Sequence, residues 1–394
     1  DTKFSIFNDY NIDKLNFSFD ISKDNFTFSD IKFKLNSLDF KSEIVRAKKD
    51  KDQYLLTGSI DNSSIYLNSK NISFLKESFP SLLNVKEISF SSNNKFSINV
   101  DKKFKFKDIK VNSTIKVNEA KILNKYNLNK IFPEIKNEIS IINSKIKLDY
   151  ENENFKIKAL GDILLQKNID SFSLNFEKKN KKVIFKNILK IKKNPILIDF
   201  LNFEKNKKVE SKIEINGFKN KKNQTVLNLL SLHEGDSKIL FKNINLDEKN
   251  KLKALDLIDL NYLDKDKQKN LLKIFKDSNN NYVVNGDFLN AEKLIERILL
   301  NNNKNFNFNG NFSVNVGINR VRLDNKFFLS NFSGNLKFKN QNLSDGQLNG
   351  NFPNEKKMIF TVKTINKNKI TTLYIDHAKP IVKNYKFIKG FDEG

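Results

Sequence analysis

Residues Phe306–Ile318, FNFNGNFSVNVGI, alternate between apolar and polar positions. Successive side chains of a strand point to opposite faces, so this stretch predicts one long strand with an apolar face and a polar face. Its length, roughly 40 Å at about 3.3 Å per residue, exceeds that of an ordinary strand. The apolar phase changes after Ile318, which predicts a bend or bulge near Asn319–Arg320.

Similar alternating segments fill most of the chain, and short stretches rich in Asn, Lys and Asp separate them. Leu15–Ile21 and Ile31–Leu35 are clear examples, with a slip in the alternation at Ser29–Asp30. Closely spaced strand patterns with few helical ones predict an antiparallel β protein. Apolar residues recur at helical spacing, or suit a short helix, in Asn71–Leu83, Glu119–Lys136, Asn290–Leu300 with Asn290 as N-cap, and Ala378–Lys389. Lys265–Phe275 is predicted to be a loop or a short helix.

Two architectures fit this pattern of strands. One is a closed sandwich, and the other is an open, curved sheet whose apolar face forms a groove. The length of Phe306–Ile318 favours the open sheet, because sandwich strands are usually shorter. The predicted fold class is therefore mostly β, with an elongated, curved antiparallel sheet that forms an open apolar groove and with a few short helices.

Half of the 12 glycines share one local pattern, apolar-x-Gly-x-apolar, in which the glycine lies on the apolar face of a predicted strand. They are Gly58, Gly161, Gly286, Gly310, Gly334 and Gly350. A glycine inside a strand leaves a gap in the layer of side chains. The gap either relieves curvature or makes a bulge, or it leaves room for a ligand chain or a packed helix.

The composition bounds the partners of this 394-residue chain, which carries a formal net charge of +25. Its bias towards Lys, Asn, Ile and Phe is what an AT-rich genome imposes through codon choice, so part of the charge is discounted. The remainder favours an anionic partner such as lipid headgroups or nucleic acid. The chain has no Cys, which excludes disulfides and thiolate metal sites but leaves the compartment open.

Few residues suggest catalysis. The two histidines, His233 and His377, lack the close spacing of metal ligands, and they are predicted to be a turn residue and a capping or surface residue. The sequence has no Gly-rich phosphate loop before a helix and no Gly-x-Ser-x-Gly. We therefore predict no enzymatic activity, no cofactor and no metal. A hydrolase would need a pocket that joins one histidine to carboxylates.

Lys alternates with Phe in places, as in Phe104-Lys-Phe106-Lys, and such mixtures occur in single-stranded nucleic-acid sites. In a strand, however, alternation puts the lysines and the phenylalanines on opposite faces. A base stacked on Phe would then lie on the other side of the sheet from the Lys that should meet its phosphate. We therefore predict no nucleic-acid partner.

Three segments close the chain. Val284–Leu299, VNGDFLNAEKLIERIL, is a Gly-containing strand pattern that leads into a helix with paired aliphatic residues. Residues 308–352 follow as a series of hairpins ending in a Leu-x-Gly-x-Phe strand, and Leu373–Gly394 places an acidic residue before a helical stretch. Together they resemble AsmA-like proteins. Lys379-Pro380 departs from a Gly-containing step of that family, and its paired glycine is spread to Gly390 and Gly394.

The resemblance implies a bridge-like lipid-transfer protein of the periplasm. It implies an inner-membrane anchor, a helix outside this chain, and phospholipid acyl chains that move along a β-groove towards the outer membrane. It divides the chain into a groove region, 1–285, which matches only in style, and an AsmA-like C-terminal region, 286–394, cut at its end. The implied partners are phospholipids and the two membranes. The alternative is a structural or adhesin-like β scaffold without a ligand. The implied groove lining is Phe306, Phe308, Gly310, Phe312, Val314, Val316, Ile318, Phe332, Leu336 and Phe338.

Overall fold

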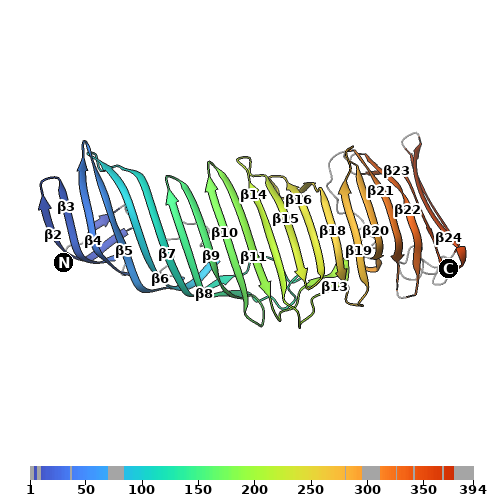
Figure 1. Ribbon diagram of the computed structural model, residues 1–394, viewed down its shortest axis with the longest axis horizontal. Helices are drawn as coiled ribbons and strands as arrows, with labels where there is room; N and C mark the ends of the chain where they lie inside the picture. The colour runs from blue at the N-terminus through green and yellow to red at the C-terminus, as the bar shows by residue number, and fades with distance from the viewer. Residues whose placement is uncertain are drawn as a thin grey trace. The chain divides into compact units, whose positions relative to one another are not determined.

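The computed structural model describes residues 4–6, 10–35, 38–69, 84–279, 281–294, 311–324, 326–339, 342–365 and 368–376. The chain separates into two compact units, both visible in Figure 1. The first unit comprises Asp1–Asn127 and Glu134–Lys190, and the second comprises Leu128–Pro133 and Ile191–Gly394. The division at residue 285, which rests on the resemblance, stays a prediction.

The first unit is a meander in which each strand pairs antiparallel with the next one along the chain. Alternating apolar and polar residues, joined by short polar turns, favour this topology because consecutive strands need only a tight hairpin. The strands are β1 (Phe4–Ile6), β2 (Tyr10–Ser22), β3 (Asn25–Leu35), β4 (Leu38–Asp50), β5 (Gln53–Leu67), β6 (Val85–Asp101), β7 (Phe106–Leu123), β8 (Glu138–Glu151), β9 (Asn154–Leu164), β10 (Asp170–Lys179) and β11 (Lys182–Ile191).

The second unit begins with a short ribbon and continues as a second meander. The ribbon is β12 (Leu197–Ile198) and β13 (Phe203–Glu204), joined by the 3-10 helix η2 (Asp199–Leu201). The later strands are β14 (Ser211–Lys219), β15 (Thr225–Glu234), β16 (Ser237–Leu246), β17 (Leu252–Ala254), β18 (Leu257–Leu263), β19 (Lys269–Lys276), β20 (Tyr282–Asn290), β21 (Phe312–Arg322), β22 (Phe328–Lys339), β23 (Asn342–Asn351), the 3-10 helix η3 (Pro353–Glu355), β24 (Lys357–Ile365) and β25 (Asn368–Ile375).

One pair of strands in the second unit is parallel. β20 and β21 run in the same direction, whereas the other described pairs are antiparallel. A parallel pair needs a crossover connection, and residues 291–311 supply it. The described part of that connection is helical at 292–294, and the Glu292 N–H donates to Asn290 Oδ1 at 3.3 Å. Asn290 therefore caps the N-terminus of this helical turn, as the sequence predicts. The rest of the predicted helix Asn290–Leu300 lies outside the described residues.

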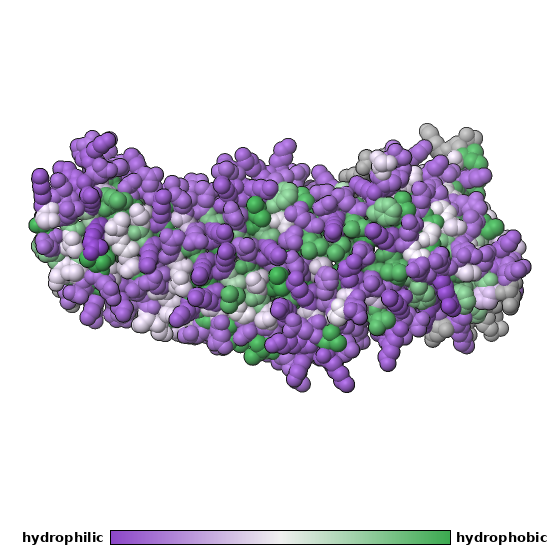
Figure 2. Space-filling model, viewed as in Figure 1, coloured by the Kyte–Doolittle hydropathy of each residue, from purple (hydrophilic) through white to green (hydrophobic). Residues whose placement is uncertain are grey.

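The predicted fold class is confirmed: the described residues are mostly strand, the helices are few and short, and the sheet is curved, open and largely antiparallel. Among the described strands, no pairing joins β1 to β11 or β14 to β25, so neither unit closes into a barrel. The view in Figure 2 is dominated by hydrophilic residues, with hydrophobic ones in scattered groups. This agrees with the high proportion of charged residues in the sequence.

Single polar residues in the left-handed conformation interrupt several strands. Asp30, Asn143 and Asn331 have φ of 52°, 48° and 50°, and the strand register shifts close to each of them. Asp and Asn adopt this conformation more readily than other residues with side chains, and the bulges that result bend a strand. Asp30 explains the slip in alternation that the sequence shows at that point.

The predicted bend at Asn319–Arg320 has a different form in the structure. β21 continues through both residues to Arg322, and Ile318 and Val321 are both buried, so the burial phase does change there. The left-handed residue is Asn331 of β22, which lies between the partners of Ile318 and Arg320. The irregularity that accommodates the phase change therefore sits on the neighbouring strand.

Three local predictions are wrong. Lys265–Phe275 is not a loop or a short helix, because Lys269–Phe275 lies in β19 and pairs with β18 and β20. Glu119–Lys136 is not a helix, because β7 extends to Leu123 and its Ala120 and Ile122 pair with β8, while the remaining residues form turns. The apolar residues of this segment are spaced as on one face of a helix, but they belong to the end of a strand and to the irregular backbone that follows it. His233 is not a turn residue but lies within β15, opposite Lys212 and Lys238. The helices predicted over Asn71–Leu83 and Ala378–Lys389 lie outside the described residues.

Five-residue turns of one design recur in the chain: Asp101–Lys105, Asn220–Gln224 and Asp247–Lys251. In each turn, a side-chain oxygen of the first residue accepts the backbone N–H groups of the third and fifth residues at 2.8–3.1 Å. The fourth residue is left-handed in all three turns, with φ of 57–59°. These fourth residues are Phe104, Asn223 and Asn250.

These turns predict a pH effect. Backbone N–H donation, chiefly from Lys105 and Lys251, holds the pKa of Asp101 and of Asp247 below the ordinary value of 3.8. A carboxylate with a lowered pKa stabilises the turn above its ordinary pKa, and this contribution is lost as the pH falls through the lower, folded value. We expect the amide NMR signals of Lys105 and Lys251 to titrate below pH 3.8. The Gln224 amide should not titrate, since Asn220 has no proton to gain; equal titration of all three would contradict this account.

Candidate functional site

The described residues of the predicted lining lie together on one face of the β21–β22 pair. The rings of Phe312 and Phe338 stack with their centres 4.9 Å apart, and Tyr282 of β20 meets Phe312 edge-on at 5.5 Å. The register places the lining residues opposite one another or opposite a glycine: Phe312–Phe338, Val314–Leu336, Val316–Gly334 and Ile318–Phe332. The lining residues outside the described part of the chain are Phe306, Phe308 and Gly310. Contact of any of these residues with lipid stays a prediction.

This apolar face extends across the second unit as a row of mutually opposite residues, which we call the long row. Each member is the register partner of the next, from β14 to β25, and none carries a charge. The members are Ile215, Leu230, Phe241, Ile258, Ile274, Val284, Val316, Gly334, Leu348, Phe360 and Leu373. Sequence reasoning named only Val316 among them as lining, because the alternation of one strand does not give its register with the next.

Every member of the long row is half-buried. The adjacent row is covered better, since Leu232, Ile239, Leu260, Leu272 and Ile318 are all less than 9% exposed. A second apolar layer packed on a sheet buries the large side chains of the inner face almost completely. Neighbours within one sheet cover only the flanks of a side chain. The tops of the long row therefore keep accessible apolar surface.

The first unit has a comparable row, which runs from β2 to β11. Its members are Phe19, Phe28, Val45, Gly58, Phe96, Val111, Tyr150, Phe155, Lys178 and Val183. Phe19 is 63% exposed, and the other members are half-buried. Lys178 is the one charged residue in this row, and it stands where the run Phe172, Leu174, Phe176 would continue with an apolar residue. The alternation of Phe172, Leu174 and Phe176, broken by Lys178, is the sequence signal for that interruption.

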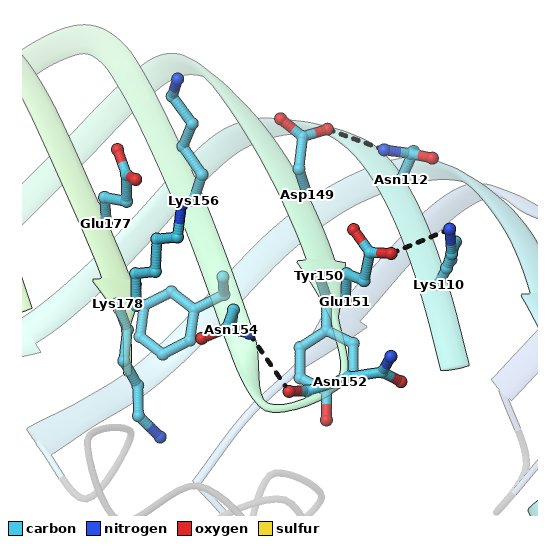
Figure 3. A pocket seen from close by; sticks show the side chains of 12 residues that line it. Lys110, Asn112, Asp149, Tyr150, Glu151, Asn152, Asn154, Lys156, Glu177 and Lys178 are labelled. Atoms are coloured by element: carbon cyan, nitrogen blue, oxygen red, sulfur yellow. Dashed lines mark hydrogen bonds and ion pairs between the residues drawn. The ribbon is translucent and has the colours of Figure 1, made fainter. Parts of the chain in front are cut away.

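A hollow of about 540 Å³ lies near the β8–β9 hairpin, at the charged end of this row (Figure 3). Lys178 places its Nζ 5.9 Å from the centre of the Phe155 ring, and Tyr150 lies on the same side of the sheet. Asp149 and Lys156 point to the other side. The lining of the hollow comes from both faces of the sheet and includes the rings of Tyr150 and Phe155, the carboxylates of Asp149, Glu151 and Glu177, and four lysines.

The glycines of the apolar faces do not leave open space. A Cβ added to Gly58 would lie 2.9 Å from Val45 Cγ2 and 3.0 Å from Phe96 Cζ, and one on Gly286 would lie 2.7 Å from the Leu271 carbonyl oxygen. Gly161, Gly334 and Gly350 are similarly occupied by atoms of the neighbouring strand. Close approach within the sheet explains these five glycines, so the interpretation as room for a ligand is wrong for them. Gly310 lies outside the described residues.

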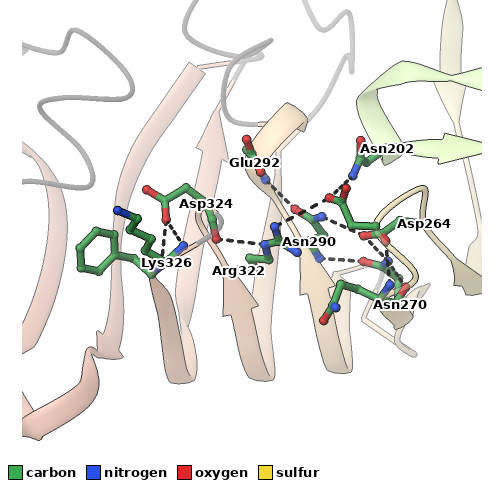
Figure 4. A network of polar contacts seen from close by, with 11 residues as sticks. Asn202, Asp264, Asn270, Asn290, Glu292, Arg322, Asp324 and Lys326 are labelled. Carbon is green, nitrogen blue, oxygen red and sulfur yellow. Dashed lines mark hydrogen bonds and ion pairs between the residues drawn. The ribbon is translucent and has the colours of Figure 1, made fainter.

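A buried polar cluster closes one end of β18, β19 and β20 (Figure 4). Asp264, Asn270 and Asn290 are at most 4% exposed. The Asp264 carboxylate accepts Asn290 Nδ2 at 2.8 Å, Asn270 Nδ2 at 3.4 Å and the Gln268 N–H at 2.8 Å. The Asn290 N–H donates to Asn270 Oδ1 at 2.7 Å. The buried polar groups of the cluster are hydrogen-bonded to one another, which indicates a structural role.

Candidate metal ligands were sought in the part of the chain that the structure describes. Groups of three or more His, Cys, Asp or Glu placed to hold a metal ion are absent there. His233 is half-buried among strands, and His377 lies outside the described residues. Over the same described ranges, no helix is long and apolar enough to cross a membrane.

Charged side chains on the polar face form ion pairs and hydrogen bonds with one another at the surface. Lys121 donates to Glu87, and Tyr66 Oη donates to the same carboxylate at 2.6 Å. Donation by Lys121, more than by Tyr66, lowers the pKa of Glu87. Because Glu87 pairs with Lys121 at the surface of the sheet, its shifted pKa reflects surface pairing rather than a site poised for proton transfer.

The protein was compared with protein families, with curated proteins and with solved structures. No family model, curated protein or solved structure matches this chain.

Proposed function

We propose that this protein is a non-enzymatic lipid-transfer protein that holds phospholipid acyl chains against the apolar face of its sheet. The observation that carries the proposal is the long row, an uninterrupted line of half-buried apolar residues across β14–β25. The resemblance to AsmA-like proteins supports the same conclusion and adds the setting. In that setting the protein is periplasmic, is anchored to the inner membrane, and conducts phospholipid towards the outer membrane.

The energetics favour an acyl chain as the ligand. Each methylene removed from water contributes about 0.8 kcal/mol, so a chain laid along the row gains free energy along its whole length. No directional contact is needed, because the hydrophobic effect is non-directional and scales with apolar area. The headgroup stays in solvent beyond the row, which avoids the cost of burying its charge.

The row also suits movement of the ligand. Its members are aliphatic, aromatic or glycine, and they follow one another from strand to strand without a charged residue in between. An acyl chain that shifts by one strand exchanges one apolar contact for an equivalent one. A small difference between neighbouring positions means a small barrier between them. A single deep pocket would instead hold the lipid in one place.

The row of the first unit differs from the long row because it contains a charged residue, Lys178, close to its end on β11. Its ammonium group interrupts an otherwise apolar row beside Phe155 and Tyr150. Such a group suits the phosphate of a lipid whose acyl chain lies on the rings, because a charge-assisted contact to phosphate is stronger than a neutral one. We infer that the phosphate of a headgroup meets Lys178 while the acyl chain lies on Phe155 and Tyr150.

Lipid extraction from the purified protein tests the proposal directly. We expect wild-type protein to carry phospholipid that solvent extraction releases and mass spectrometry identifies, with both acyl chains intact since no hydrolysis is proposed. After detergent removal of the lipid, the protein should take up fluorescent phospholipid again. A wild-type protein that carries none and takes up none would overturn the proposal and favour the structural scaffold.

A further inference from the structure

The turn between β6 and β7 presents an aromatic side chain in an unfavourable backbone conformation. Phe104 has φ of 57°, in the left-handed region that residues with bulky side chains rarely adopt. The turn around it is well fixed, because Asp101 Oδ1 accepts the N–H groups of Lys103 and Lys105 at 2.9 Å each. The Phe104 N–H also donates to the Asp101 carbonyl oxygen at 2.9 Å.

Other turns of the chain show which residues take this position. In the equivalent turns Asn220–Gln224 and Asp247–Lys251, the left-handed position holds Asn223 and Asn250. In Asp264–Gln268, which has the same backbone hydrogen bonds, it holds Lys267 with φ of 60°. Asn adopts this conformation at low steric cost. A Phe at the same position is therefore explained neither by the backbone of the turn nor by its hydrogen bonds.

Packing within the protein does not explain Phe104 either. Its side chain is 85% exposed, the highest value among the exposed large hydrophobic residues described, and Phe106 nearby is 52% exposed. Burial of a Phe side chain contributes to stability only when the ring leaves water. Here the ring is held out into solvent at the end of a hairpin by a rigid turn.

The surroundings of Phe104 are basic. Lys102, Lys103, Lys105 and Lys107 lie within three residues of it. Lys102 pairs with Asp52, and Lys107 lies 3.3 Å from Asp101, so these two charges are partly balanced. Lys103 and Lys105, on either side of the ring, are exposed. The tip therefore presents an apolar ring between two ammonium groups.

We propose that the Asp101–Lys105 turn inserts Phe104 into the surface of an anionic phospholipid bilayer. An aromatic ring enters the boundary between headgroups and acyl chains, while flanking lysines contact lipid phosphates. This assignment accounts for the exposed ring, the basic flanks and the strained position together. It stands independently of lipid binding on the apolar rows, since it concerns contact with a membrane and not carriage of a lipid.

A tryptophan reporter tests the contact, because the chain has no Trp of its own. Phe104→Trp places a single fluorophore at the tip, and Tyr126→Trp places one at another exposed aromatic position, where the side chain is 72% exposed. Both variants of the 394-residue chain are mixed with vesicles of phosphatidylcholine, or of phosphatidylcholine with phosphatidylglycerol. We expect emission from position 104 to shift to the blue with the anionic vesicles only, and emission from position 126 to stay unchanged.

Vesicle sedimentation supplies a second measurement. Phe104→Asn restores the residue found in the equivalent turns, so we expect it to fold and to bind anionic vesicles about tenfold more weakly than wild type. Tyr126→Asn should bind as wild type does. The absence of a blue shift at position 104, or undiminished binding by Phe104→Asn, would overturn the proposal. Lipid bound on the rows should be unchanged in Phe104→Asn, so the two proposals fail separately.

Discussion

Val316→Asp is expected to lower the amount of phospholipid that co-purifies with the protein by about tenfold. Val316 lies in the middle of the long row, between Val284 of β20 and Gly334 of β22. In lipid-free protein, the carboxylate can remain hydrated because the side chain is half-buried and its neighbour on β22 is a glycine. An acyl chain that crosses this position would have to dehydrate the charge, which costs more than the contact gains. A tenfold loss corresponds to about 1.4 kcal/mol.

The matched control for this variant is Asn315→Asp. It adds the same charge one residue away on the same strand, but on the opposite and exposed face. We expect it to retain wild-type lipid content. Urea denaturation of both variants separates a loss of lipid from a loss of fold. Equal lipid content in the two variants would show that this face does not carry the ligand.

Much of the fold follows from alternation alone. Leu15–Ile21, Ile31–Leu35 and the C-terminal half of Phe306–Ile318 all became strands with the predicted face apolar, because the two-residue period of a strand is strict. The spacing of the segments, joined by polar turns, also indicated an antiparallel arrangement. What alternation cannot supply is the pairing of β20 with β21, since a parallel neighbour depends on a crossover.

The failures have local physical causes. Apolar residues of Glu119–Lys136 fit a helix only when the end of β7 and the turns beyond it are counted together. Each left-handed residue, such as Asp30 or Asn143, moves the alternation by one position, and a count over a longer window then mixes two phases. Such a bulge requires no particular sequence beyond a tolerant Asp or Asn, so its position is hard to predict.

The candidate site was predictable in part. The pattern of one strand correctly gathered Phe312, Val314 and Ile318 on one face of β21, but the long row exists only once the register of every strand is known. The glycines suggested gaps because their Cα positions lie on the apolar face, whereas neighbouring strands occupy the space. The polar cluster was invisible because Asp264 and Asn290 are 26 residues apart and neither has an unusual sequence context.

Asp264→Ala is expected to give the largest loss of stability among these variants, about 3 kcal/mol in the free energy of unfolding. The substitution removes the acceptor for the amides of Asn270 and Asn290 and for the Gln268 N–H, in a region that is almost fully buried. A buried donor left without a partner costs about 1–3 kcal/mol, and losses that share one cluster add incompletely. Urea denaturation followed by circular dichroism measures the change.

Asp247→Ala is the control that separates the effect of the buried Asp264 cluster from the effect of a turn of the same kind. Asp247 accepts backbone N–H groups in the turn to Lys251 much as Asp264 accepts that of Gln268, but the residues around Asp247 are exposed. Water replaces the lost acceptor there, so the expected loss of stability is much smaller. If the two variants unfold at the same urea concentration, the turn alone accounts for the effect and the cluster contributes nothing. If Asp264→Ala alone is strongly destabilised, the buried amides hold the ends of β18, β19 and β20 together, and with them the first turn of the crossover that begins at Glu292.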